Sequence, residues 1–191
     1  APLKSAEMHV HSFKGALSGG TAASFGEIIA RGRKDPTIGE LLRNPYAICP
    51  SNQRSGVGQP NLYGVNRSGL TGEWLHHFFM APVNTRVVHA TNAHLNYPYG
   101  RDFRYQEATM MGKGVSGWLG AAAMSVGLGG FVLLASLGPT RRLLERYLLP
   151  KPGEGPNREQ RETGFFDLRQ FGKLPDGTVV RTKITGDRDP G

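Results

Sequence analysis

The chain has 191 residues, of which 38% are hydrophobic and 20% charged, so it suits one domain or a large part of a bigger protein, and wholesale disorder is excluded. The formal net charge of +8 favours an anionic partner (nucleic acid, acidic lipid or a phosphorylated cofactor) or reflects only a solvated basic surface. Cys49 is the single cysteine, which excludes an intrachain disulfide and a cysteine-based zinc cluster and is compatible with a reducing compartment.

The chain opens with a predicted strand that leads through a glycine-bearing turn into a helix. Residues 6–15 alternate apolar and polar side chains and end in glycine, a pattern typical of a strand. The string "LSGGTAAS" follows, and residues 22–31 have the periodicity of a short helix. The turn can aim backbone N–H groups and the Ser18 and Thr21 hydroxyls at a carbonyl or phosphate, or it can be only a tight turn with a helix cap. Its spacing matches neither a Walker loop nor GxGxxG.

A second short helix and a long irregular segment come next. Residues 35–45 predict the helix, because aspartate precedes proline at its start and Asn-Pro ends it. Its buried face would consist of Ile38, Leu41 and Leu42. Residues 46–72 are rich in Gly, Asn, Ser and Pro, so we expect an irregular segment long enough to be a lid or a binding loop.

The middle of the chain predicts one helix and one strand. Residues 84–95 begin with an asparagine cap and have a helical apolar face. That face would be formed by Val87, Val88, Thr91 and Leu95. Further on, Phe103, Tyr105 and Glu107 alternate with polar residues, as in a half-exposed strand. Glu107 is a candidate catalytic acid or a member of an ion pair on the sheet face.

Residues 114–140 contain no charged side chain. The segment from Trp118 to Gly138 would be about 30 Å long as an α-helix, enough to cross the core of a bilayer. Three mid-segment glycines disfavour a regular helix in water. Contact with the membrane interface, a true span and burial inside the protein all stay open. The candidate membrane contacts are Trp118, Phe131, Leu133, Leu134, Arg141, Arg142 and Arg146.

The last part predicts an amphipathic helix and a hairpin. Residues 139–149, "PTRRLLERYLL", place leucines and tyrosine on one side and mostly charged residues on the other, which favours interfacial contact for the apolar segment before them. Two β-type runs surround Pro175-Asp176-Gly177, the signature of a β-hairpin. Strand–helix at the start and hairpin at the end predict an α+β (mixed α/β) fold, with a mixed sheet packed by helices.

Metal and nucleic-acid sites are not expected. His9 and His11 face the same side of the predicted strand but have no third ligand at a suitable spacing, so a structural role is favoured. Arginines alternate with aromatics in "RDFRYQE", yet no RNP-like consensus surrounds them.

The order of several motifs resembles the C-terminal portion of saccharopine dehydrogenase-like oxidoreductases, with the trans-acting enoyl reductase branch as the nearest match. The similar strings are "GALSGGTAAS", "APVNTRVVHATNAHL", "YGRDFRYQEATM", "KPGEGPNREQRETGFFDLRQFG" and "TGDRDPG". Together they cover nearly the whole chain.

The resemblance implies a particular domain organisation. Members of the family place a Rossmann NAD(P)-binding domain before this region, and no GxGxxG follows a predicted strand here, so we expect that domain to lie outside this chain. An initial Ala and the turn-like end also suggest two cut ends. Residues 1–112 would be the strand–helix portion of the substrate domain, 113–150 an apolar and amphipathic helical insertion, and 151–191 a hairpin that completes the sheet.

The resemblance also implies a function. The full-length protein would be an NADP-dependent oxidoreductase of lipid metabolism that reduces an enoyl or acyl lipid or polyketide intermediate, either free or bound to a carrier protein. This chain alone would not be an enzyme but would shape the substrate side. The implied substrate contacts are Ser18, Gly19, Gly20, Thr21, Tyr105 and Glu107.

An alternative is a non-catalytic membrane-surface or lipid-associated protein on a reductase-like scaffold. It is motivated by the charge-free segment, the arginines behind it and the lack of an identifiable acid–base pair. Under either hypothesis we expect a cytoplasmic, membrane-associated protein, with homodimerisation open and nucleic acid excluded as a partner.

Overall fold

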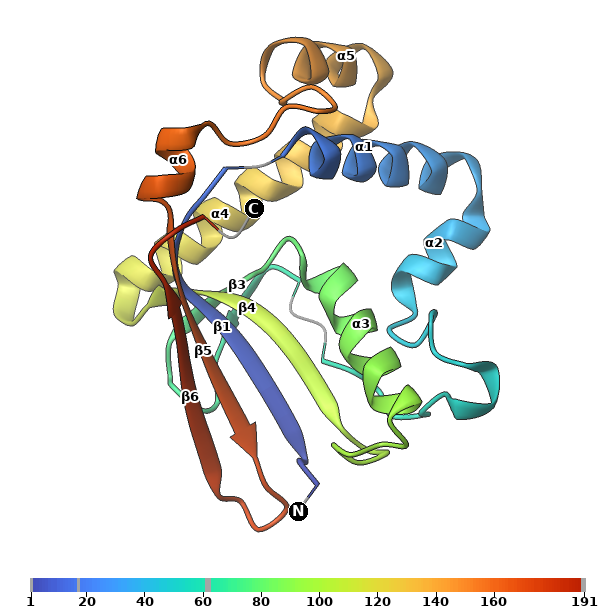
Figure 1. Ribbon diagram of the computed structural model, residues 1–191, viewed down its shortest axis with the longest axis vertical. Coiled ribbons are helices and arrows are strands. Elements are labelled where there is room, and N and C mark those ends of the chain that lie inside the picture. The colour runs from blue at the N-terminus through green and yellow to red at the C-terminus, as the bar shows by residue number, and fades with distance from the viewer. Residues whose placement is uncertain (1, 17, 61–62, 190–191) are drawn as a thin grey trace. The chain divides into compact units, whose positions relative to one another are not determined.

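The computed structural model describes residues 2–16, 18–60 and 63–189 (Figure 1). The described part is an α+β fold with a mixed six-stranded sheet and six α-helices, as predicted. In chain order the elements are β1 (Ser5–Lys14), α1 (Gly19–Lys34), α2 (Pro36–Arg43), a 3-10 turn (Ser51–Gln53), β2 (Val65–Arg67), β3 (Trp74–His77), α3 (Ala81–His94), β4 (Arg104–Gly112), α4 (Gly114–Ser136), α5 (Gly138–Tyr147), α6 (Arg158–Thr163), β5 (Phe165–Lys173) and β6 (Val179–Gly186).

The sheet has the strand order β2-β3-β4-β1-β5-β6. Its central pair, β1 and β4, is parallel, with Ser5 opposite Arg104 and Val10 opposite Thr109. Strand β3 is antiparallel to both β2 and β4. The parallel centre and antiparallel flank make the sheet mixed, and β2 and β6 are its edge strands.

The predicted hairpin is confirmed as β5 and β6. Leu174 donates its backbone N–H to the Thr178 carbonyl over 2.8 Å, and the Asp176 carboxylate accepts the Thr178 N–H over 2.8 Å. Gly177 has φ of +91°, a conformation that glycine adopts without strain. The turn residues therefore set the loop between the strands.

The main core cluster lies where α3 packs against the sheet. Met8 and Val10 of β1 meet Phe103 and Tyr105, and Val88 of α3 packs against them. These side chains recur with a period of two along β1 and around the start of β4, so one face of the two central strands is buried. The same face positions the site described below.

The predicted buried face of α2 is wrong, and that of α3 packs against the core only at Val88. Helix α2 has no buried residue, and Leu41 is 53% exposed. In α3, Val87 and Leu95 are exposed, and the buried positions are Ala81, His89, Ala90, Asn92 and Ala93. Hydrophobic periodicity tells which side chains share a helix face, but not which face is buried. The buried face of α3 packs closely and therefore consists mainly of small residues. It also contains Asn92, whose side chain accepts the Tyr99 N–H and donates to the Gly100 carbonyl.

The fold divides into two compact units, each built from three segments of the chain. The first comprises Ala1–Ser12, Leu41–Ser125 and Asp167–Ile184, and the second comprises Phe13–Glu40, Val126–Phe166 and Thr185–Gly191. The predicted division into 1–112, 113–150 and 151–191 follows chain order and stays a prediction.

The charge-free segment forms α4, which continues through all three of its central glycines. Among the described residues it is the one helix long and apolar enough to cross a membrane, with a mean hydropathy of 1.8 over its most apolar window. Only 11% of that window is buried by the protein. A helix that is apolar on all sides is normally covered by protein or lipid, so the low burial of α4 bears on function.

Candidate functional site

Strand β4 brings Tyr105 and Glu107 together. Side chains two residues apart on a strand lie on one face, and Glu107 is only 4% exposed. The Tyr105 hydroxyl donates a hydrogen bond of 2.9 Å to Oε1 of Glu107. From α3, Nδ2 of Asn84 donates to Oε2 of Glu107 over 2.8 Å. In the described part of the chain, neutral donors thus satisfy Glu107, and the ion pair considered for it does not form.

Asn84 was expected to cap a helix that starts at its own position. The helix begins earlier, at Ala81, and a proline lies in its first turn, where a missing backbone N–H costs nothing. Asn84 therefore falls inside the first turns of α3, and its side chain is available to Glu107.

Burial sets the protonation behaviour of this cluster. It raises the pKa of the Glu107 carboxyl, and the hydrogen bonds from Asn84 and Tyr105, which favour the ionised form, offset only part of the rise. Burial, and then the neighbouring Glu107 charge, raises the pKa of Tyr105, so its phenol keeps its proton. A buried carboxyl with a raised pKa beside a fixed donor is typical of sites that bind or transfer protons.

A second layer of hydrogen bonds holds Tyr105 in place. Its backbone N–H donates to Oε1 of Gln59 over 3.0 Å, and Nε2 of Gln59 donates to the Phe103 carbonyl over 3.1 Å. The same Gln59 amide contacts the Tyr46 hydroxyl, which in turn donates to the Val57 carbonyl over 2.8 Å. The described part of the irregular segment 46–72 is therefore anchored to β4.

Glu107 lines a groove of about 460 Å³ between the segment that follows α2, the start of α3 and β4. Arg86 and His77 line it too. Arg86 donates to the backbone carbonyls of Leu41, Leu42 and Pro82, and burial lowers its pKa.

His77, which also lines the groove, is affected by burial. Burial, and then the nearby His76, lowers the pKa of His77, so its imidazole is neutral at pH 7. Its neighbour His76 instead contacts Oγ of Ser125 over 3.1 Å, and the two imidazoles diverge as adjacent side chains on a strand do. A groove with a guanidinium, a neutral imidazole and a buried carboxyl can bind and orient a carbonyl compound.

The predicted contacts Ser18, Gly19, Gly20 and Thr21 belong to the second unit, whereas Tyr105 and Glu107 belong to the first. Ser18 is the N-cap of α1, and its Oγ accepts the Thr21 N–H over 3.3 Å. Gly19 donates its N–H to the Glu154 carbonyl over 2.7 Å. The helix-cap interpretation of this turn is therefore confirmed, and a role in contacting substrate stays a prediction.

This turn does not fit the pyrophosphate of a dinucleotide cofactor. Anion binding at a helix start uses free backbone N–H groups, and those of Gly19 and Thr21 are already bonded within the chain. A Cβ at Gly19 would lie 1.7 Å from the Lys151 carbonyl oxygen, so protein backbone already fills the approach that the glycine leaves open. We derive no chemical step through a nicotinamide in this chain. The described residues also contain no group of three or more His, Cys, Asp or Glu side chains that could hold a metal ion.

Sequence reasoning found Tyr105 and Glu107 but missed their partners. Asn84 and Arg86 fall within the string "APVNTRVVHATNAHL", but nothing in that string marks them as partners of Glu107, and Gln59 and His77 lie outside every quoted string. The alternation along β4 was the available signal, since it placed Tyr105 and Glu107 on the buried face.

This fold and groove define an α+β protein with a buried, hydrogen-bonded carboxyl, and its relatives narrow the class. The chain is 36% identical over 195 aligned residues to a provisionally named trans-acting enoyl reductase of Mycobacterium tuberculosis (strain ATCC 25618 / H37Rv), covering 95% of this chain and 45% of that protein. It is 31% identical over 184 residues to a trans-acting enoyl reductase of Mycobacterium bovis (strain BCG / Pasteur 1173P2), covering 91% and 43%.

A third relative, a trans-acting enoyl reductase of Mycobacterium ulcerans (strain Agy99), is 30% identical over 163 residues, or 81% of this chain and 39% of that protein. The chain is therefore related to trans-acting enoyl reductases along nearly all of its length, and it spans less than half of theirs. No protein-family profile matches it, and no solved structure does.

Proposed function

We propose that this chain forms the substrate side of an NAD(P)H-dependent enoyl reductase that acts on an acyl lipid or polyketide intermediate. The observation that carries the proposal is the similarity to trans-acting enoyl reductases over 95% of the chain. The resemblance to saccharopine dehydrogenase-like oxidoreductases, in which a separate Rossmann domain binds the nicotinamide, supports the assignment of these residues to the substrate. The nicotinamide would supply the hydride when bound.

The groove beside Glu107 is the place we assign to the enoyl thioester. Arg86 and the Glu107 cluster offer polar groups for its carbonyl, and Tyr46 and Val57 offer apolar contact for the acyl chain. Glu107, fixed by Tyr105 and Asn84, would hold a proton near the reacting part of the substrate.

Kinetics of the full-length protein test this assignment. Glu107→Gln keeps the shape of the side chain but removes its titration, and Tyr105→Phe removes the hydroxyl that orients it. We expect each to lower kcat/KM for NADPH-dependent reduction of a short enoyl thioester by about 10- to 100-fold, the value of a hydrogen bond to a charged or reacting group. In Glu107→Gln, the pH dependence that a raised carboxyl pKa produces should also disappear.

Tyr99→Phe is the matched control, because Tyr99 packs on the same core and no hydrogen bond of its hydroxyl is found in the described structure. Its kcat/KM should stay near that of the unmodified protein. Unchanged kinetics in both Glu107→Gln and Tyr105→Phe would remove Glu107 and its groove from the proposal. Failure of the full-length protein to bind NADPH at all would favour the non-catalytic alternative.

We also propose that the second unit contacts an anionic lipid surface. The end of α4 and the following α5 expose Val126 (76%), Leu133 (62%) and Tyr147 (70%) in the same unit. Arg142 and Arg146 are exposed beside them, with the Arg146 guanidinium 5.2 Å from the Tyr147 ring centre. Exposed apolar side chains bordered by arginines are the combination that binds anionic headgroups. Leu134 is likewise exposed and Phe131 is half-buried, while Trp118, also exposed, belongs to the first unit.

Vesicle binding tests the lipid contact. Leu133→Asp and Leu143→Asp replace exposed side chains, and each should weaken binding of the full-length protein to phosphatidylcholine/phosphatidylglycerol vesicles about tenfold, because one buried leucine contributes roughly 1.5–3 kcal/mol. Leu95→Asp, at a 60% exposed position in the other unit, is the control and should bind normally. Equal binding by all four proteins would contradict the lipid contact. Concentration-dependent self-association that Leu133→Asp abolishes would assign the surface to a second copy instead.

A further inference from the structure

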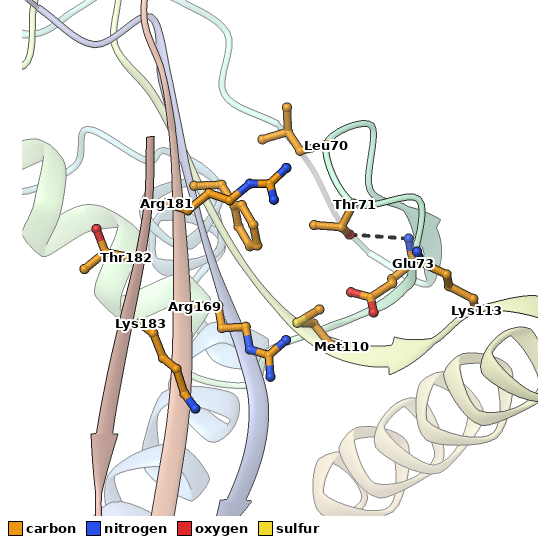
Figure 2. Close-up of a pocket in the computed structure, with 10 residues that line it drawn as sticks. Leu70, Thr71, Glu73, Met110, Lys113, Arg169, Arg181, Thr182 and Lys183 are labelled. Atoms are coloured by element: carbon orange, nitrogen blue, oxygen red, sulfur yellow. Dashed lines mark hydrogen bonds between the residues drawn. The ribbon is translucent and has the colours of Figure 1, made fainter. Parts of the chain in front are cut away.

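A second pocket in the first unit shares no lining residue with the Glu107 groove. It has a volume of about 460 Å³ and lies between the β5–β6 hairpin, the end of β4 and the turn between β2 and β3. Figure 2 shows the guanidinium groups of Arg169 and Arg181 extending from the hairpin toward the turn that carries Thr71 and Glu73.

Four cationic side chains line this pocket: Lys113, Arg169, Arg181 and Lys183. Those of β5 and β6 occur at every second residue, so they lie on one face of the hairpin. Asp167 pairs with two of them, over 3.4 Å to Arg169 and 3.4 Å to Lys183. Within the described residues, Arg181 and Lys113 have neither an ion pair nor a hydrogen-bonded partner of their side chains.

The floor of the pocket is apolar, and Thr71 contributes to its wall. Met110 and Phe171 are buried to 8% and 7% exposure. A concave site with cations above a low-dielectric floor concentrates positive potential and attracts an anion more strongly than a flat basic surface does. Arginine forks match the geometry of phosphate oxygens.

Glu73 is the acidic side chain among the residues that line the pocket. Its Oε2 is shielded from solvent and has no hydrogen-bond partner among the described residues, so contact with a ligand would fall to the part of the carboxylate that lines the pocket. A fully deprotonated oxyanion such as sulfate, which has no hydroxyl to donate, would gain nothing from this carboxylate and would be repelled by its charge. A ligand with a hydroxyl or amine next to its phosphate would satisfy both the arginines and Glu73.

We propose that this pocket binds a phosphate ester, with the phosphate held by Arg169 and Arg181 and a neighbouring hydroxyl or amine donating to Glu73. The ligand is either a soluble ester or a phospholipid headgroup, which present the same chemistry. The inference does not depend on the reductase activity, because its readout is binding alone.

Calorimetric titration of the full-length protein with glycerol 3-phosphate and with sulfate, an anion that has no hydroxyl, tests the assignment. Arg181→Gln removes a side chain that is exposed and without a partner in the described structure, so the fold should persist. It should raise the Kd for glycerol 3-phosphate about tenfold, the loss expected for one charge-assisted contact. Lys4→Gln removes the same charge from an exposed position outside the pocket and should leave the Kd within about twofold.

Glu73→Gln gives the sharper result. It should strengthen binding of sulfate by removing a repulsive charge, and it should reduce the preference for glycerol 3-phosphate over sulfate. Equal losses in Arg181→Gln and Lys4→Gln would reduce the binding to general charge attraction and overturn the proposal. So would the absence of heat with either probe.

Vesicles distinguish the two sources of the ligand. If the ligand is a headgroup, binding to phosphatidylglycerol-containing vesicles should fall in Arg181→Gln and should be competed by soluble glycerol 3-phosphate. If the ligand is a soluble ester, glycerol 3-phosphate should bind to the unmodified protein, and Arg181→Gln should bind vesicles as well as the unmodified protein does. Arg181→Gln could instead lower only the solubility of the protein and change the binding of neither glycerol 3-phosphate nor vesicles. The cations would then serve only to keep the edge strand β6 from pairing with other chains.

Discussion

His89 shows how one buried residue makes stability depend on pH. Its side chain is 4% exposed, with ring centres 4.9 Å from Tyr46 and 6.2 Å from Phe103. Its Nε2 is buried and has no hydrogen-bond partner in the described structure. Burial lowers the pKa of His89 from 6.5 to about 4, since a charged imidazole cannot be solvated there.

The lowered pKa predicts acid destabilisation. Between pH 6.5 and about 4 the unfolded state binds a proton that the folded state rejects, so the stability is complete above pH 6.5 and is lost as the pH falls toward 4. His89 alone should make the free energy of unfolding about 2 kcal/mol lower at pH 5 than at pH 7. His89→Phe should remove most of that difference in urea titrations at the two pH values. A difference that stays the same in His89→Phe would mean that other groups cause it.

At the scale of an element, the start of α1 is fixed by close contact with the segment before α6. Gly19 has no space for a side chain, because its Cβ position lies 1.7 Å from the Lys151 carbonyl oxygen and that atom belongs to the backbone. Gly20, the next residue, is exposed, and its Cβ position has an ordinary contact of 3.9 Å with Oγ of Ser18. Position 19 therefore requires glycine, whereas position 20 has space for a side chain.

This contrast predicts opposite effects for two adjacent substitutions. Gly19→Ala should lower the free energy of unfolding by about 2 kcal/mol or more, because the backbone of one segment must move. Gly20→Ala should raise it by about 0.5–1 kcal/mol, because alanine loses less entropy in a helix. Thermal unfolding of both variants decides the point. Equal destabilisation by the two would show that the contact with Lys151 is not maintained in solution.

The elements also show where sequence patterns succeed. The β5–β6 hairpin and the buried face of β4 were predictable, because turn chemistry and period-two alternation are local properties. The buried faces of α2 and α3 were not predictable. Leu41, for example, lies on the apolar face of α2 and is nevertheless 53% exposed. Periodicity describes a helix, and burial depends on what packs against it.

At the scale of the whole molecule, the α+β class and the relation to enoyl reductases followed from the order of motifs, but the composition of the groove did not. Glu107 meets Asn84 from α3, and Tyr105 meets Gln59 from the preceding segment. Contacts of this kind join polar residues that have no periodicity and no fixed spacing. The net charge of +8 likewise did not predict where an anion would bind, whereas in the structure four cationic side chains line one pocket of the first unit.

The parallel pairing of β1 with β4 sets the order in which the first unit can assemble. Ser5 must find Arg104, so β1 has no partner on that side until about half of the chain has been made. Its other neighbour, β5, comes later still. Closing loops of this length costs entropy before any contact repays it, so folding should be slow and late in synthesis. Strand β1 therefore stays open to wrong partners for most of the time that the ribosome needs to complete the sheet.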